Sequence, residues 1–205
     1  MRRANSKSVF INCPFTDDYS DIFRAIVFTV ADCGFEPRSA LEVDDSGDIR
    51  IQKIESLIEQ SKFGIHDISN MKLDPQSNLP RFNMPLELGI FMGAKRFGGE
   101  EQKRKRLLVL DQERYRYQKA ISDISGQDIK SHGGEPAKAI KCIRDWLKGV
   151  SRRTTIPGAT HIAKRYKQYE EALPSICDKL SYEVDELTFN DMWETMVIWQ
   201  DETDR

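Results

Sequence analysis

The chain has 205 residues, which suits one domain of roughly 140 to 150 residues with an extension and is short for two complete domains. The 31 Lys and Arg residues nearly balance 33 Asp and Glu residues, so the overall charge favours neither nucleic acid nor an anionic membrane as a partner. The sequence shows no signal-peptide pattern and no run of about 18 apolar residues. A cytoplasmic protein without a membrane partner is the simplest expectation.

The first part of the chain alternates short apolar runs with segments of helical periodicity. In chain order, the predicted elements are strand 9–13, helix 21–32, strand 35–41, helix 49–60 and strand 63–68. Gly34 is suited to end the first helix, and Pro37 weakens the second strand. The Asp-rich loop 44–48 is suited to cap the second helix.

The alternation continues after a polar loop. The predictions are loop 70–81, a helix that begins near Pro85, strand 106–111, a short helix and polar loop over 112–134, and helix 136–148. This order predicts an α/β fold with a doubly wound, flavodoxin-like parallel sheet and helices on both faces.

A linker and two further helical segments follow the predicted sheet. Residues 1–150 are predicted to form an α/β nucleotide-binding or glycosyl-transfer domain, and residues 151–205 a helical C-terminal extension. The extension is expected to pack on that domain or on a partner. Its apolar residues, including Trp193 and Trp199, are candidates for an interface in a homo-oligomer.

Glu87 is a carboxylate in an otherwise apolar helix. Because Pro85 suits the first helical position, Glu87 is expected in the first turn, near the positive end of the helix dipole. Two interpretations stay open: the side chain complements the dipole, or it performs chemistry.

Ligands of open parallel sheets bind outside the carboxyl ends of the strands, where the strand order reverses. The candidate substrate-binding residues at this edge are Asn12, Pro14, Phe15, Asp45, Arg50, His66 and Asn83. Arg38 and Arg50 supply positive charge there, and an arginine near a helix start is suited to hold a phosphate or carboxylate.

An acid-rich pocket fits sugar hydroxyls and the oxocarbenium-like transition state of glycosidic cleavage. Glu87 and Asp67 are therefore the candidate catalytic residues. Glu87 would stabilise or attack the anomeric carbon. Asp67 would bind hydroxyls or protonate the leaving base, which requires a raised pKa, or it would simply cap a loop.

Other chemistries have little support. The chain lacks GxGxxG after its first strand, GxxxxGK[ST] and GxSxG, and its three histidines lack metal-ligand spacing. No metal and no resident cofactor are expected. The four cysteines are interpreted as reduced thiols, and Cys13 as a nucleophile beside His66 is a weaker alternative.

Three segments resemble the nucleoside 2-deoxyribosyltransferases and the Toll/interleukin-1 receptor (TIR) domains. Residues 9–15 (Val-Phe-Ile-Asn-Cys-Pro-Phe) resemble the transferases' first strand, 61–69 their third strand, and Glu87-Leu88-Gly89 with Gly93-Ala94-Lys95 their E-L-G helix. The resemblance spans about residues 8–111. Residues 81–85 depart from the Gly-rich, acidic segment that precedes this helix in the transferases, residues 112–134 and the extension match neither family, and the TIR W-C-x-x-E motif is absent.

The resemblance implies a flavodoxin-like fold and an active site that is often completed across subunits. It implies that Glu87 is the catalytic residue and Asp67 a substrate-binding acid. The substrate would be a nucleoside, a nucleotide or NAD, and bacterial relatives in both families act in antiviral defence.

Three functions follow as hypotheses. The first is a hydrolase or transferase that acts on an N-glycosidic bond. The second is a non-catalytic, TIR-like nucleotide-binding and assembly module. The third, nucleic-acid binding through residues 103–106, is less favoured because such charge runs usually face solvent.

Overall fold

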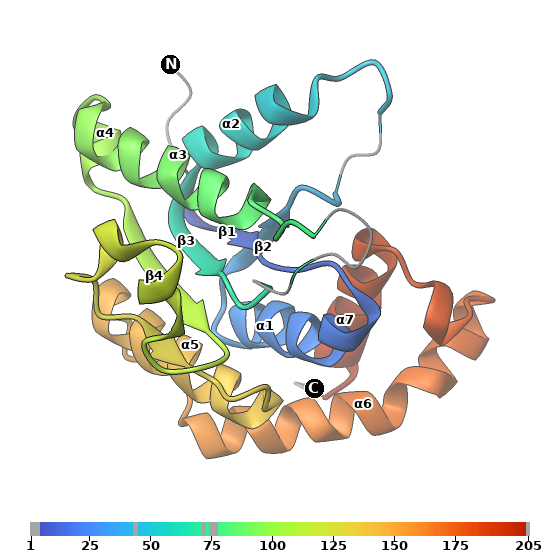
Figure 1. Cartoon of the computed structure of the whole chain (residues 1–205). Helices are drawn as coiled ribbons and strands as arrows, with labels where there is room; N and C mark the ends of the chain where they lie inside the picture. Colours follow the sequence, from blue (N-terminus) through green and yellow to red (C-terminus); the bar gives the residue numbers. More distant parts are fainter. Residues whose placement is uncertain (1–4, 43–44, 71–72, 74–77, 204–205) are drawn as a thin grey trace.

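The computed structural model describes residues 5–42, 45–70, 73 and 78–203. Parts of the expected loops 44–48 and 70–81, and the last residues of the extension, lie outside this range. Five parallel strands form one sheet in the order β2-β1-β3-β4-β5 (Figure 1). Their bounds are β1 Asn5–Asn12, β2 Glu36–Ser39, β3 Ser61–Asp67, β4 Arg106–Asp111 and β5 Lys130–Ser131. The strand order reverses between β1 and β3, as in flavodoxin-like folds.

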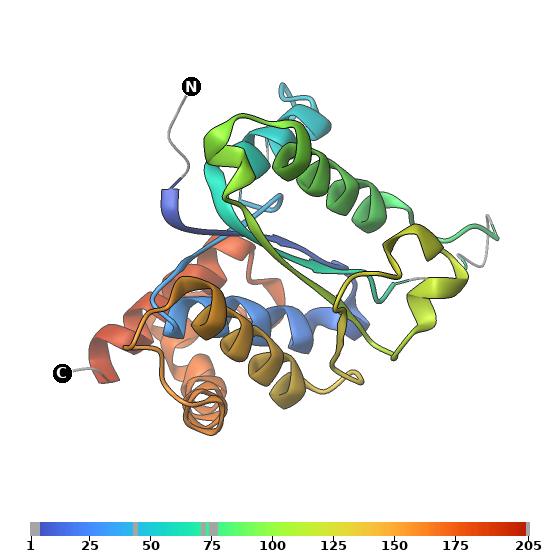
Figure 2. The same ribbon diagram turned by 90° about the vertical axis from the view of Figure 1, so that its left-hand side faces the viewer.

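Helices cover both faces of the sheet, which confirms the prediction of an α/β fold with a parallel sheet. The helices are α1 Ser20–Asp32, α2 Arg50–Gln60, α3 Asn83–Phe97, α4 Glu100–Lys103, α5 Pro136–Ser151, α6 Ala159–Leu180 and α7 Phe189–Thr203. Figure 2 shows α2 and α3 on one face, and α1 and α5 on the other. Helices α6 and α7 form a further layer outside α1.

Local signals account for several boundaries. Gly34 has a φ of 77°, and the Phe35 N–H donates to Val30 O at 3.1 Å, so Gly34 ends α1 as predicted. Strand β2 is short and lies at the sheet edge, where Pro37 is tolerated. The predicted cap of α2 by the Asp-rich loop is absent among the described residues, because Ile49 occupies the N-cap position.

Strand β5 was not predicted and falls inside the expected polar loop 112–134. Its two residues pair only with Leu110 and Asp111, so the strand is too short to show a period in the sequence. Its position is set by the neighbouring strand and by His132, which follows it. The four-residue helix α4 was missed for the same reason.

The C-terminal extension packs on the sheet domain, within the same hydrophobic core. Phe28 of α1 stacks on Tyr169 of α6 at 5.4 Å between ring centroids and contacts Trp199 of α7 at 5.6 Å. Tyr169 and Met196 are fully buried. The expectation that Trp199 forms an intermolecular interface is wrong, because its ring is buried inside the chain. Within the described residues, no helix combines the length and apolarity that a membrane span requires.

Candidate functional site

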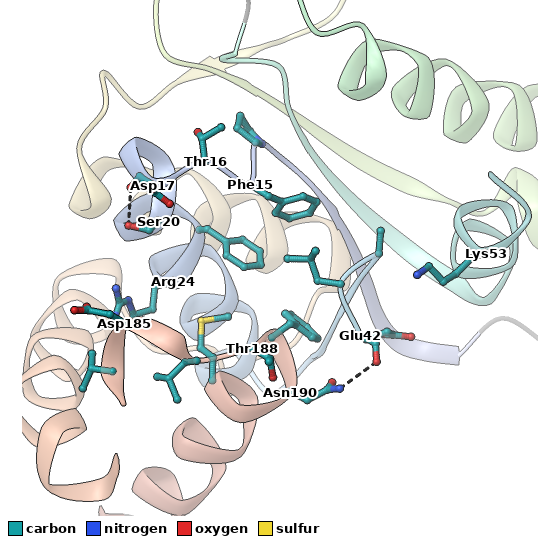
Figure 3. Close-up of a pocket in the computed structure, with 18 of the residues that line it drawn as sticks. Phe15, Thr16, Asp17, Ser20, Arg24, Glu42, Lys53, Asp185, Thr188 and Asn190 are labelled. Atoms are coloured by element: carbon teal, nitrogen blue, oxygen red, sulfur yellow. Dashed lines mark hydrogen bonds between the residues drawn. The ribbon is translucent and has the colours of Figure 1, made fainter. Parts of the chain in front are cut away.

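A cavity of about 870 Å³ opens beside the carboxyl ends of β1 and β2 (Figure 3). Its wall comes from four segments: the β1–α1 loop with the start of α1, the end of β2, the first turn of α2, and residues 184–192 of the C-terminal extension. The cavity is therefore displaced from the β1–β3 switch point toward the sheet edge. The extension supplies one whole side of it.

Three of the predicted substrate-binding residues line this cavity: Pro14, Phe15 and Arg50. The Phe15 ring is 37% exposed and meets Phe23 edge to face at 5.4 Å. Phe23 in turn lies 6.2 Å from Phe189 of α7. These three phenylalanines form an aromatic wall, with Phe15 as its most accessible ring.

Some of the arginines near the cavity have an acidic partner, whereas Arg50 has none among the described residues. Arg24 pairs with Glu170 at 3.3 Å, and Arg38, one of the two arginines expected to supply positive charge, is held by Glu42 at 2.8 Å. Arg50 has no salt bridge to any described residue within 4.0 Å, and α2 has no acidic residue in its first turn. Arg50 therefore gives the side of the cavity at the start of α2 a positive charge.

Glu87 lies on α3 but not in its first turn. Asn83 and Met84 are already helical ahead of Pro85, and the Leu86 N–H donates to Phe82 O at 3.0 Å. The first-turn expectation is wrong because proline is tolerated throughout the first turn, where N–H groups lack intrahelical partners. Glu87 therefore occupies the second turn, and dipole complementation no longer explains it.

The Glu87 side chain is only 7% exposed, and no hydrogen bond from a described residue reaches its carboxylate. Burial raises the pKa of Glu87 to about 7, and the positive charge of Arg50 opposes this rise. The carboxylate does not line the large cavity, although Arg50, whose charge acts on its pKa, does. A carboxyl group with this pKa exchanges protons readily at neutral pH.

Asp67 is fully buried in a polar network at the end of β3. Its Oδ1 accepts the Ser69 N–H at 2.8 Å, and its Oδ2 lies 2.9 Å from His132 Nε2. Because the Gly134 N–H donates to His132 Nδ1, the ring proton is on Nε2, which lies 3.1 Å from Ser69 Oγ and beside the Asp67 carboxylate. Burial alone would raise the pKa of Asp67, but His132, Ser69 and Tyr19 together hold it below its ordinary value.

This environment is the opposite of what a leaving-group acid requires. Asp67 has no exposed surface and stays ionised at neutral pH. The proton-donor role would require a raised pKa, whereas the pKa of Asp67 is lowered, because the β5 loop brings His132 against the carboxylate. Within this fold, Asp67 ties the ends of β3 and β5 together.

Asn12 and His66 lie side by side beneath the carboxyl edge, on β1 and β3. The Asn12 amide nitrogen lies 3.1 Å from His66 Nδ1 and donates to Met84 O at 2.9 Å. Burial lowers the pKa of His66 to about 3, so its ring is neutral. Both residues are buried and connect the strands to the start of α3, rather than facing the cavity.

Asp45 and Asn83 are exposed and lie outside the cavity lining. Asp45 instead stabilises its own loop, where its Oδ1 accepts the Gly47 N–H at 2.8 Å. Asn83 is the first residue of α3. Neither position follows from sequence spacing, because both depend on how the loops leave the sheet.

The structure weakens two alternative functions, a Cys13 nucleophile and a nucleic-acid surface at residues 103–106. Cys13 is 1% exposed, and burial raises its thiol pKa well above the ordinary value, which disfavours a thiolate nucleophile. In the basic run, Lys103 and Arg104 pair with Glu100 and Glu101. Lys105 is buried and donates to Ile58 O at 2.5 Å, so the run is not a continuous nucleic-acid surface.

The sequence predictions missed many cavity residues, including every one on the extension. The missed lining includes Lys53, Val184, Asp185, Leu187, Thr188, Phe189, Asn190 and Met192. Thr188 and Asp191 form a recognisable helix-start pattern that would have located the beginning of α7. Nothing in the sequence indicates that this start folds back to β2, where Asn190 donates to Glu42 O at 3.1 Å.

The fold and the cavity define an α/β protein with a flavodoxin-like strand order and a pocket at the carboxyl edge of its sheet. No protein-family model matches the chain, and no curated protein matches it.

Proposed function

We propose that this protein is a hydrolase or transferase that acts on the N-glycosidic bond of a nucleoside, nucleotide or NAD. Glu87 is its catalytic carboxylate. The observation that carries the proposal is Glu87 itself, which is buried near the start of α3 and whose pKa burial raises to about 7 against the opposing charge of Arg50. Such shifts concentrate at functional sites.

The chemistry starts from ionised Glu87. Its oxygen attacks the anomeric carbon while the bond to the base breaks, and the base leaves with the bonding electrons and takes a proton from solvent. Water or a second base then displaces the Glu87 carboxylate from the sugar. In this scheme Asp67 is a positioning residue, because its low pKa disqualifies it as the proton donor.

The resemblance to nucleoside 2-deoxyribosyltransferases and TIR domains supports the proposal, since Glu87 matches the glutamate of their catalytic helix. The strand order of those families agrees with that of this chain. A cytoplasmic effector that depletes nucleotides or NAD would be one use of such an activity.

The test is base release from NAD, nucleosides and nucleotides, followed by chromatography. We expect Glu87→Gln to lower release by at least about a thousandfold, as loss of a covalent nucleophile does. Glu55→Gln, an exposed substitution on α2, is the matched control and should keep full activity. Activity of Glu87→Gln close to that of the wild type would refute the catalytic role.

A second candidate is a nucleotide-binding module without catalysis. The observation that favours it is that neither Glu87 nor Asp67 lines the 870 Å³ cavity. Stoichiometric binding of a nucleotide with no base release from the wild type would establish this function instead.

A further inference from the structure

We propose that the cavity binds a nucleotide in preference to the corresponding nucleoside. The phosphate lies at the start of α2, against Arg50 and Lys53, and the base lies beside Phe15. This assignment names the substrate class and rests on the proposed function.

The first argument is the charge at the start of α2. Arg50 and Lys53 occupy its first four residues, its first turn has no acid, and the Ile49 N-cap has no side-chain hydrogen bond. Helix starts ordinarily favour acids, so the charge of Arg50 there opposes the helix dipole. A bound anion reverses that effect, because it interacts favourably with Arg50 and with the N–H groups at the helix start.

The second argument is the neighbouring carboxylate. Glu87 is more than nine-tenths buried, receives no hydrogen bond from a described residue and is influenced chiefly by burial and Arg50. Arg50 lines the cavity, and its positive charge also acts on the pKa of this carboxyl group.

The third argument is the polarity of the cavity. Figure 3 shows Lys53 reaching the cavity from α2, whereas Asp17, Arg24 and Asp185 gather at the opposite end. Arg24 is already paired with Glu170, so Asp17 and Asp185 leave that end unfavourable for a phosphate. The charges thus orient a phosphorylated ligand with its anionic group toward α2.

The fourth argument is the aromatic wall and the volume. Phe15 points into the cavity with an accessible ring and is braced by Phe23 (Figure 3). Bases stack on such rings with little dependence on their identity. A volume of about 870 Å³ lies within the range of small-molecule pockets and is large enough for a nucleotide.

The experiment is calorimetric titration of Glu87→Gln with adenosine, AMP, cytidine and CMP. We expect each nucleotide to bind at least about tenfold more tightly than its nucleoside, because charged hydrogen bonds hold the phosphate. The difference should shrink as salt rises from about 0.05 to 0.5 M, because screening weakens exposed charge pairs.

Variants assign the two ends of the ligand. Arg50→Gln should weaken nucleotide binding about tenfold and leave nucleoside binding unchanged, whereas Phe15→Ala should weaken both. Arg96→Gln, an exposed arginine on α3 outside the lining, is the matched control and should change neither.

Equal affinity for nucleosides and nucleotides, no effect of Arg50→Gln, or no binding of either nucleotide would overturn the assignment. These outcomes are separate from failure of the proposed function. Binding is measured in a variant expected to be inactive, whereas the catalytic role is judged from base release by Glu87→Gln beside the wild type.

Discussion

Because the pKa of Glu87 is raised in the fold, the free energy of unfolding should depend on pH through this residue. Its pKa is 4.5 in an ordinary environment and about 7 in the fold, so the folded state holds a proton that the unfolded state releases between these values. The stabilising contribution is complete below pH 4.5 and is lost as pH rises through 7. At pH 8, Glu87→Gln should raise the free energy of unfolding by up to about 3 kcal/mol.

Urea denaturation at about pH 5 and pH 8 checks this prediction. The two proteins should differ little at the lower pH, where folded Glu87 is protonated. Both proteins keep His66, whose lowered pKa destabilises the fold in acid, so its effect cancels in the comparison. A gain for Glu87→Gln that did not grow between the two pH values would contradict the raised pKa of Glu87.

At the scale of elements, the start of α7 is the part of the extension that shapes the cavity. Thr188 Oγ1 accepts the Asp191 N–H at 3.3 Å, and the Asp191 carboxylate accepts the Thr188 N–H at 3.0 Å, which is a capping box. Thr188→Ala should cost about 1 kcal/mol and speed amide exchange in the first turn of α7.

Hydrogen exchange of the ligand-free protein measures this effect. Thr155→Ala is the control, because Thr155 is exposed in the loop between α5 and α6. Unchanged protection of the α7 start in Thr188→Ala would mean that packing of Phe189, rather than the cap, holds this segment.

At the scale of the whole molecule, the extension and the sheet domain share a core. Tyr169, Leu173 and Trp199 are buried with Phe28 of α1 in the same hydrophobic cluster. Each such side chain contributes about 1.5 to 3 kcal/mol, so together they rival the total stability of a typical domain, about 5 to 15 kcal/mol.

A chain that ends at residue 158 should therefore lack a cooperative thermal transition, measured by circular dichroism. The point variant Phe28→Ala should destabilise the intact chain by about 3 to 5 kcal/mol, whereas Val197→Ala, on the exposed side of α7, should have a small effect. Cooperative unfolding of the shortened chain would show that the sheet domain is stable alone.

The sequence by itself determined four of the five strands and most of the helices, but not the two-residue strand β5. Alternating apolar runs and helical periods report burial along one element, and Gly34 marks a helix end by its backbone requirement alone. Pro14, Phe15 and Arg50 reach the cavity because the carboxyl ends of parallel strands share one edge.

Only the tertiary structure decided which of the candidate residues contact one another and which line the cavity. Asp67 is held ionised by His132, which arrives from a loop with no period of its own, and Asn12 and His66 are buried beneath α3. The cavity wall comes from residues 184–192, far along the chain, and Arg50 is available because Glu42 holds Arg38 instead. Periodicity describes how one element faces the core. Burial, pKa and the shape of a pocket depend on contacts between elements distant in sequence, which no local pattern encodes.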